Sequence, residues 1–180
     1  MAKVTIRKTS SLSGIVEAPS SKAYTHRAVI AASLSNGESR IRRPLVCDDT
    51  EATENAVRAY GAKVEEGEAE WIVFGASNLE MKKKVIDCGE SAATMRFVTP
   101  IIAHPPGITE VTGGESLRKR PMEPLLVALR QLGVVCYSLD CSGRPPLVVH
   151  GGGIRGGIAF IPGDISSQFI SGLLFASPLA

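Results

Sequence analysis

The feature that most constrains the fold is an internal repeat with a period of roughly 70 residues. Residues 54–64 combine an amphipathic pattern, a glycine at Gly61 and a following apolar run. Residues 126–136 repeat that combination around Gly133, 72 positions later (133 − 61). A glycine directly after a helical pattern is a common C-cap, so each segment predicts the end of a helix followed by a strand.

Three further segments share a second pattern. Residues 21–34, 91–103 and 166–176 each begin with serine and continue as an apolar run, and Arg27 and Arg96 lie one turn inside the first two, 69 positions apart (96 − 27). A helix that is apolar nearly all round is typical of a buried element. We therefore expect three buried helices, each opening one repeat.

Between these helices the pattern predicts a strand, an amphipathic helix carrying charges on one face, and two strands joined by a polar turn. The closing strands are expected to pair residues 62–66 with 71–74, and residues 134–139 with 147–150. The fold class is therefore α/β, built of repeated βαβαββ units, two complete and the start of a third. The units span about residues 19–85, 86–155 and 156–180.

The first residues precede the repeated units. Residues 1–8 alternate between polar and apolar side chains, which predicts a strand within a segment 1–18, ahead of a domain 19–180. The start carries no pattern of a signal peptide.

Composition excludes several classes of protein. The chain has a net charge of +2 and 5% aromatic residues, which argues against nucleic-acid binding. It is 44% hydrophobic without a membrane-length apolar run, which predicts a soluble protein with no membrane contact. The scattered cysteines form no CxxC pair, so we expect reduced thiols, no bound metal and a cytoplasmic location.

Attraction for anions must therefore be local. A helix N-terminus with serine hydroxyls and free N–H groups binds phosphate or carboxylate. A single serine at a helix start is more often a simple N-cap, but three such starts in register favour an anion site. Lys22 and Arg27 would lie about 140° apart around a helix, and share a face only if Lys22 precedes the first regular turn. The basic run Arg118, Lys119 and Arg120 is either a solvated loop or a group that closes over a ligand after the flexible Gly113 and Gly114.

Five segments, in order, resemble motifs of the 5-enolpyruvylshikimate-3-phosphate synthase family, and match its N-terminal part. They are Ser-Ser-Lys-Ala-Tyr-Thr-His-Arg-Ala at 20–28, Asp-Asp-Thr at 48–50, Gly-Glu-Ser-Ala-Ala-Thr-Met-Arg at 89–96, the loop 114–122 ending Arg-Pro-Met, and Asp-Ile-Ser-Ser-Gln-Phe at 164–169.

The resemblance implies a monomeric, cytoplasmic transferase of the shikimate pathway to chorismate and aromatic amino acids. Such an enzyme transfers the carboxyvinyl group of phosphoenolpyruvate to the 5-hydroxyl of shikimate 3-phosphate, without metal or organic cofactor. It implies a partner for this chain, a C-terminal domain that supplies the acid and base groups and to which residues 1–18 would belong. The 180 residues alone are then expected to bind substrate, to lack turnover and to be prone to self-association.

The resemblance also implies residue roles. Lys22 is catalytic and contacts both substrates, and the remaining assignments follow by substrate. Shikimate 3-phosphate would be bound by Lys22, Ala23, Arg27, Ser166, Ser167 and Gln168, and phosphoenolpyruvate by Lys22, Ala92, Arg120 and Gln168.

Some positions depart from the family pattern. Ala23 stands where serine is usual, and Glu90 and Ala92 stand where asparagine and glycine are usual. Two alternatives stay open. One is the related transferase that acts on UDP-N-acetylglucosamine, although its usual loop cysteine is absent from residues 113–120. The other is a non-catalytic domain that binds phosphorylated metabolites.

Overall fold

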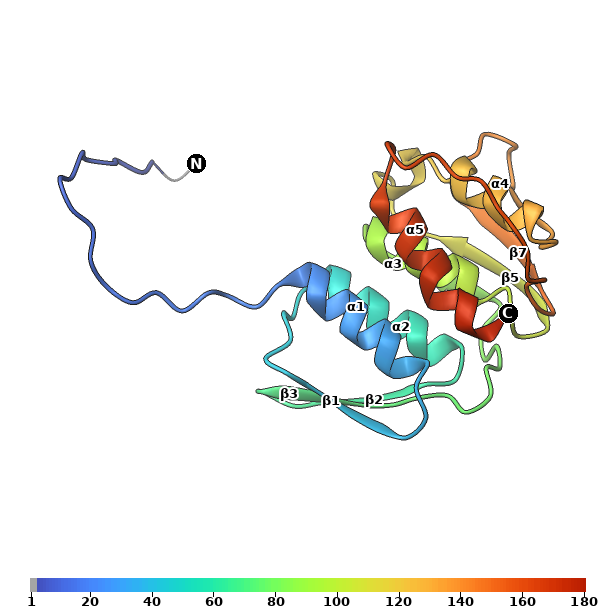
Figure 1. Cartoon of the computed structure of the whole chain (residues 1–180), viewed down its shortest axis with the longest axis horizontal. Helices are drawn as coiled ribbons and strands as arrows, with labels where there is room; N and C mark the ends of the chain where they lie inside the picture. The colour runs from blue at the N-terminus through green and yellow to red at the C-terminus, as the bar shows by residue number, and fades with distance from the viewer. Residues whose placement is uncertain (1–2) are drawn as a thin grey trace.

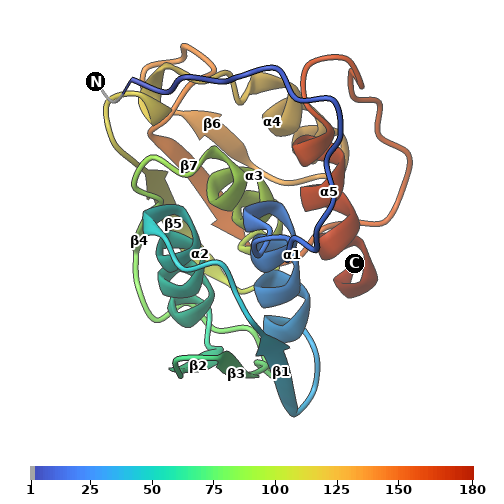
Figure 2. The ribbon, with the colours of Figure 1, turned by 90° about the vertical axis from the view of Figure 1, so that its left-hand side faces the viewer.

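The computed structural model describes residues 3–180, and its helices and strands follow the repeat (Figures 1 and 2). The first unit holds α1 (Lys22–Ser33), β1 (Glu38–Arg42), α2 (Asp48–Ala59), β2 (Lys63–Glu66) and β3 (Glu70–Phe74). The second holds β4 (Val85–Asp87), α3 (Ala92–Ile101), β5 (Gly107–Thr112), the 3-10 helix η1 (Leu117–Lys119), α4 (Glu123–Gln131), β6 (Cys136–Ser138) and β7 (Leu147–Gly151). A third unit begins with α5 (Ser167–Ala176) and the 3-10 helix η2 (Ser177–Leu179).

Two sheets carry the strands. In the first, β3 pairs antiparallel with both β1 and β2, giving the order β1-β3-β2. In the second, the order is β4-β5-β7-β6; β4 and β5 are parallel because α3 connects them, and the other pairs are antiparallel. Both closing strand pairs expected from the sequence are confirmed.

The helices α1 and α2 cover the first sheet, and α3 packs against α1, α2 and α5 (Figure 2). Burial is most complete for α3, whose last five residues are all buried. The other two opening helices keep an exposed side, with Tyr24 of α1 79% and Leu174 of α5 65% exposed. The expectation of burial on all sides is therefore right for α3 and too strong for α1 and α5.

Serine caps the start of each opening helix. The Oγ atoms of Ser21, Ser91 and Ser166 accept hydrogen bonds from backbone N–H groups two or three residues further on. This satisfies one otherwise unpaired donor per helix and fixes where each helix begins.

Glycine ends the second helix of both complete repeats. Gly61 (φ +115°) and Gly133 (φ +85°) follow α2 and α4, and each N–H bonds to the carbonyl three residues back. The next residue closes a longer loop in both units, from Ala62 N to Val57 O at 3.2 Å and from Val134 N to Leu129 O at 3.0 Å. This paired hydrogen bonding is the Schellman motif, which needs a residue of positive φ.

The expected N-terminal strand is not present among residues 3–21. Residues 3–21 form neither helix nor strand and run outward from the folded part (Figure 1); residues 1 and 2 lie outside the described range. A strand needs a neighbouring edge for its hydrogen bonds, and no strand of the described chain pairs with this segment. The first unit therefore has five of its six elements, whereas the second has all six.

None of the helices formed within residues 3–180 has both the length and the apolar character that crossing a bilayer requires.

Candidate functional site

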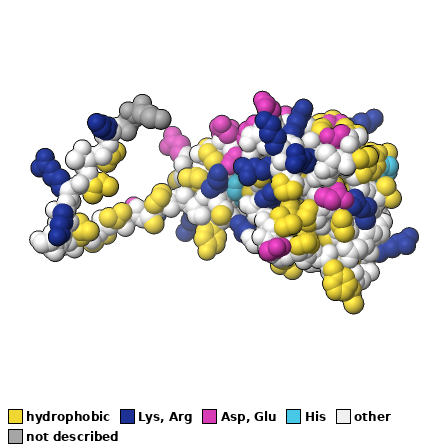
Figure 3. Space-filling model, turned by 90° about the horizontal axis from the view of Figure 1, so that it is seen from above, with side chains coloured by type: hydrophobic (Ala, Val, Ile, Leu, Met, Phe, Trp, Pro, Cys, Tyr) yellow, Lys and Arg dark blue, Asp and Glu magenta, His cyan; other side chains and the backbone are white. Residues whose placement is uncertain are grey.

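A cavity of about 340 Å³, here called the site cavity, collects most of the predicted residues. It lies where the first turns of α1, α3 and α5 meet the start of α2 and the end of the η1 loop. Its lining is Lys22, Ala23, His26, Arg27, Asp49, Glu90, Ala92, Ala93, Arg96, Arg120 and Gln168. Seen from above, Lys and Arg side chains gather close to where the extended N-terminal segment joins the folded part (Figure 3).

The convergence of three helix N-termini gives this cavity a positive potential. Each N-terminus carries roughly half a positive charge and unpaired N–H donors. Four cationic side chains face two carboxylates in the lining, so the local excess of two positive charges equals that of the whole chain. Anion attraction is thus concentrated in one place on a nearly neutral protein.

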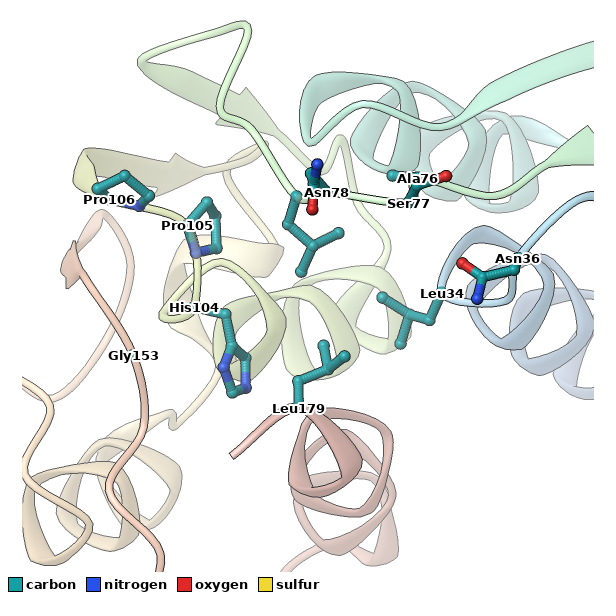
Figure 4. A pocket seen from close by; sticks show the side chains of 11 residues that line it. Leu34, Asn36, Ala76, Ser77, Asn78, His104, Pro105, Pro106, Gly153 and Leu179 are labelled. Atoms are coloured by element: carbon teal, nitrogen blue, oxygen red, sulfur yellow. The ribbon is translucent and has the colours of Figure 1, made fainter.

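A larger cavity of about 530 Å³ lies at the opposite ends of the same helices (Figure 4). It is lined by Leu34 after α1, His104 after α3 and Leu179 after α5, and its lining contains no lysine or arginine. Helix C-termini carry partial negative charge, which disfavours anions. The smaller cavity is therefore the better candidate for a phosphorylated ligand.

Lys22 is held by an ion pair with Asp49. Lys22 is the first residue of α1 and Asp49 the second of α2, and the ammonium donates to the carboxylate. The hydrogen bond and the charge of Asp49 raise the pKa of Lys22, so its ammonium stays protonated. With side-chain exposures of 51% and 26%, the pair contributes little stability, typically about 0–1 kcal/mol, and acts mainly by fixing where the charge lies.

Arg27 and Arg96 occupy equivalent places in successive repeats. The Arg27 guanidinium lies 5.1 Å from the Phe97 ring centroid, and that of Arg96 lies 4.9 Å from the Phe169 centroid. Each arginine thus lies against an aromatic ring of the next opening helix, which orients it without neutralising it. Arg27 also donates to the Ala23 carbonyl at 3.1 Å.

Arg96 is the more enclosed of the two. Its Nη1 donates to Gln168 Oε1 at 2.8 Å and to Ser166 Oγ at 3.2 Å, and its buried Nε has no partner among the described residues. Burial, and then the nearby charge of Arg120, lower its pKa from the ordinary value. The guanidinium groups of Arg96 and Arg120 thus lie close together, and neither forms an ion pair with a carboxylate among the described residues. Such a pair of cations suits a ligand with two negative charges.

Of the basic run in the η1 loop, only Arg120 lines the cavity. Arg118 turns back on its own loop, donating to Gly113 O at 2.8 Å, and Lys119 pairs with Glu115 at 2.7 Å. The run is therefore neither wholly solvated nor wholly directed at the cavity.

His26 connects the cavity to a buried chain of hydroxyl groups. Its Nδ1 lies 2.6 Å from Thr53 Oγ1, which lies 2.6 Å from Thr94 Oγ1, which donates to Ser91 Oγ at 2.7 Å. This series of hydrogen bonds joins α1, α2 and α3. Burial lowers the pKa of His26, and the nearby charges of Lys22 and Arg27 act in the same direction while that of Asp49 opposes them.

The structure brings together six of the eight predicted site residues. Lys22, Ala23, Arg27, Ala92, Arg120 and Gln168 line the site cavity. Ser166 borders it through Arg96, and Ser167 is exposed and outside the lining.

Lys22 and Arg27 both reach the site cavity despite the angle of about 140° expected between them around the helix. Lys22 is the first helical residue, and both side chains are long. The predicted roles left out five other lining residues, His26, Asp49, Glu90, Ala93 and Arg96. The 69-residue offset from Arg27 would have indicated Arg96, whereas the place of the other four depends on the packing.

Within residues 3–180 no three His, Cys, Asp or Glu side chains converge as metal ligands would.

Known proteins give an independent view of the chain. The family model described as EPSP synthase (3-phosphoshikimate 1-carboxyvinyltransferase) matches residues 6–180. A 3-phosphoshikimate 1-carboxyvinyltransferase of Methanothermobacter thermautotrophicus is 50% identical over 177 residues, covering 98% of this chain and 42% of the relative. That of Methanocaldococcus jannaschii is 46% identical over 176 residues, covering 96% and 41%.

Among solved structures, the EPSP synthase from Acinetobacter baumannii superposes with a TM-score of 0.81 at 28% identity, covering 88% of this chain and 37% of that one. The chain thus spans well under half the length of these relatives. On the match of nearly its whole length, the chain belongs to the EPSP synthase (3-phosphoshikimate 1-carboxyvinyltransferase) family.

Proposed function

We propose that this chain provides one half of the site at which the carboxyvinyl group of phosphoenolpyruvate is transferred to the 5-hydroxyl of shikimate 3-phosphate. In this reaction the hydroxyl oxygen adds to C2 of phosphoenolpyruvate, its proton passes to a base, and C3 takes up a proton from an acid. C3 then loses a proton to re-form the C2–C3 double bond, the bond between C2 and the phosphate oxygen breaks, and inorganic phosphate leaves.

The observation that supports this proposal is the cavity at three helix N-termini, which carries four cationic side chains. Both substrates are polyanions near neutral pH, and charge-assisted hydrogen bonds from lysine and arginine are about twice as strong as neutral ones. Membership of the family supplies the identity of the polyanions.

Within the proposal, the cavity is divided between the two substrates. Shikimate 3-phosphate would lie against α1 and α5, with Arg27 on its carboxylate, Ser166 and Ser167 on its phosphate, and Gln168 and Ala23 at its ring. Phosphoenolpyruvate would lie against α3 and the η1 loop, beside Ala92 and Arg120. Lys22, kept protonated by Asp49, would contact both and act in catalysis.

Acid and base groups would come from the part of the relatives that this chain does not match. The two carboxylates of the lining are already engaged, Asp49 with Lys22 and Glu90 with backbone N–H groups. We therefore expect the 180-residue chain to bind shikimate 3-phosphate without turning it over, in agreement with a role as the substrate-binding half.

The test is calorimetric titration of the chain with shikimate 3-phosphate. Arg27→Ala removes one charged hydrogen-bond donor, which typically costs about 1.5–3 kcal/mol, so the affinity should fall at least roughly tenfold. The matched control is Arg144→Ala, an exposed arginine outside the cavity lining, which should bind as the parent does. Equal affinity of Arg27→Ala and the parent would contradict the proposal.

Phosphate release with both substrates tests the second part. Turnover by the chain alone at about 1–10³ s⁻¹, the ordinary enzyme range, would show that it holds its own acid and base groups.

A further inference from the structure

Glu90 is a carboxylate in the lining of a cavity expected to bind anions, which makes it the least expected residue there. It lies in the turn between β4 and α3, directly before the N-cap of α3. Its Oε2 accepts a hydrogen bond from the N–H of Leu117 at 2.8 Å, and its Oε1 one from the N–H of Ser116 at 3.4 Å. The carboxylate is thus bound to the backbone of the η1 loop.

Two glycines allow this close approach. A Cβ on Gly114 would lie 2.1 Å from Glu90 Oε1, and one on Gly113 would lie 2.5 Å from the Gly89 carbonyl oxygen. The Gly114 N–H also donates to that carbonyl at 2.7 Å. The turn at Glu90 and the loop 113–117 therefore touch along their backbones, and a side chain at either glycine would separate them.

The contact continues from Leu117 to Arg120. Leu117 is 1% exposed and begins η1, and Arg120 ends it, donating its N–H to the Leu117 carbonyl at 3.0 Å. With Leu117 fixed at both its side chain and its N–H, the single turn of η1 sets where Arg120 enters the site cavity.

We propose that Glu90 is a positioning residue: it binds the start of η1 so that Arg120 is presented to the phosphoenolpyruvate side of the cavity. The inference rests on the proposed function and deepens it, because it assigns a role to the position where this chain departs from the family pattern. Glu90 thus acts through Arg120.

The proposal predicts that loss of the Glu90 carboxylate weakens anion binding, whereas simple electrostatics predicts that it strengthens anion binding. Removal of a negative charge from an anion-binding cavity should strengthen anion binding if Glu90 acts only by its charge. If Glu90 holds the loop, Glu90→Ala instead frees Ser116 and Leu117 and weakens binding through Arg120. Glu90→Gln removes the charge but keeps one carbonyl oxygen for the Leu117 N–H, so it should retain most of the function.

The first readout is hydrogen–deuterium exchange of the chain without ligand. Loss of a hydrogen bond to a charged group should raise exchange of the Leu117 amide at least about tenfold in Glu90→Ala, with Glu90→Gln between that variant and the parent. The matched control is Glu115→Ala, because Glu115 is the other carboxylate of this loop, is 87% exposed and pairs only with Lys119 among the described residues. In the Glu115→Ala variant, the Leu117 amide should exchange as it does in the parent.

The second readout is the affinity for phosphoenolpyruvate in the presence of shikimate 3-phosphate. We expect Glu90→Ala to weaken it at least about tenfold in the parent and to have no further effect in the Arg120→Ala background. The affinity for shikimate 3-phosphate alone should stay within about twofold of the parent value.

Tighter or unchanged phosphoenolpyruvate binding by Glu90→Ala, or an additive effect with Arg120→Ala, would overturn the inference. The two proposals fail differently. A parent chain that binds neither substrate contradicts the proposed function, whereas normal binding of both substrates by Glu90→Ala contradicts only the role of Glu90.

Discussion

At the scale of single residues, the site combines cations that must stay charged with a histidine that is held neutral. Asp49 raises the pKa of Lys22, which favours its charged form, whereas burial lowers the pKa of His26, which favours its neutral form. The same cavity thus shifts the pKa values of two basic groups in opposite directions. The direction depends on whether a neighbouring carboxylate or loss of hydration on burial has the larger effect.

The histidine gives a pH prediction. The pKa of His26 in the folded chain lies below its ordinary value of 6.5, so below about pH 6.5 the unfolded chain binds a proton that the folded chain does not. The contribution of neutral His26 to the unfolding free energy is therefore complete above that pH. It falls as the pH drops toward the folded pKa, by at most about 1.4 kcal/mol per pH unit for one histidine. We expect His26→Gln to flatten the fall in unfolding free energy between about pH 7.5 and 5.5.

Urea unfolding of parent and variant across that range measures the difference. His104, whose pKa burial also lowers, and the carboxyl groups titrate in both proteins and cancel in the comparison. Parallel curves for the two would mean that His26 has the same pKa folded and unfolded.

At the scale of elements, the two complete repeats reuse the same local devices. Each second helix ends in a Schellman glycine, and an arginine one turn earlier reaches the following strand. Arg58 donates to Val64 O at 2.8 Å and Arg130 to Cys136 O at 3.2 Å. Each device joins a helix to the strand after it, so the unit is held together before it packs against its neighbours.

The glycine caps are testable. Gly61→Ala places a Cβ at φ +115°, although the nearest atom, Ala76 Cβ, would be at an ordinary 3.4 Å. The cost is therefore conformational, and we expect a loss of at least about 1 kcal/mol in unfolding free energy. Gly163→Ala is the control, because its φ lies outside the left-handed region and no atom lies within 4 Å of the added Cβ. Equal stability of the two variants would show that the helix end at position 61 does not require glycine.

At the scale of the whole molecule, apolar surface gathers along one side of α5. Ile170 is 38% and Leu174 is 65% exposed, and both line a groove of about 460 Å³ with Leu132 and Ile154. Phe169, by contrast, is fully buried against Arg96 and α3, so the surface is smaller than the helix sequence suggests. The extended N-terminal segment adds the exposed side chains of Val4, Ile6, Leu12, Ile15 and Val16.

An exposed apolar groove together with an exposed apolar segment is uncommon on monomers, so we expect the chain to self-associate at micromolar concentration. Sedimentation velocity should show species heavier than the 19.0 kDa monomer, and Leu174→Gln should shift them toward monomer. Val127→Gln, at a 40% exposed position on α4, serves as the control and should leave the distribution unchanged. A single monomeric species for the parent chain would contradict the expectation.

The sequence by itself determined what depends on neighbours along the chain. Serine caps, glycine stops, two antiparallel strand pairs and the α/β class follow from backbone dihedral preferences and local hydrogen bonding, and the repeat made each of them visible twice. The resemblance of the motifs also named Arg27 and Arg120 for the cavity.

Only the tertiary structure decided which side chains meet. It paired Lys22 with Asp49, turned Arg118 away while admitting Arg120, and bound Glu90 to a loop 27 residues further along the chain. It also left residues 3–21 without a strand partner, because alternation supplies the side-chain pattern of a strand but not the neighbouring edge that completes its hydrogen bonds. These outcomes depend on how helices and loops distant in sequence pack together, and that information is not contained in any single segment.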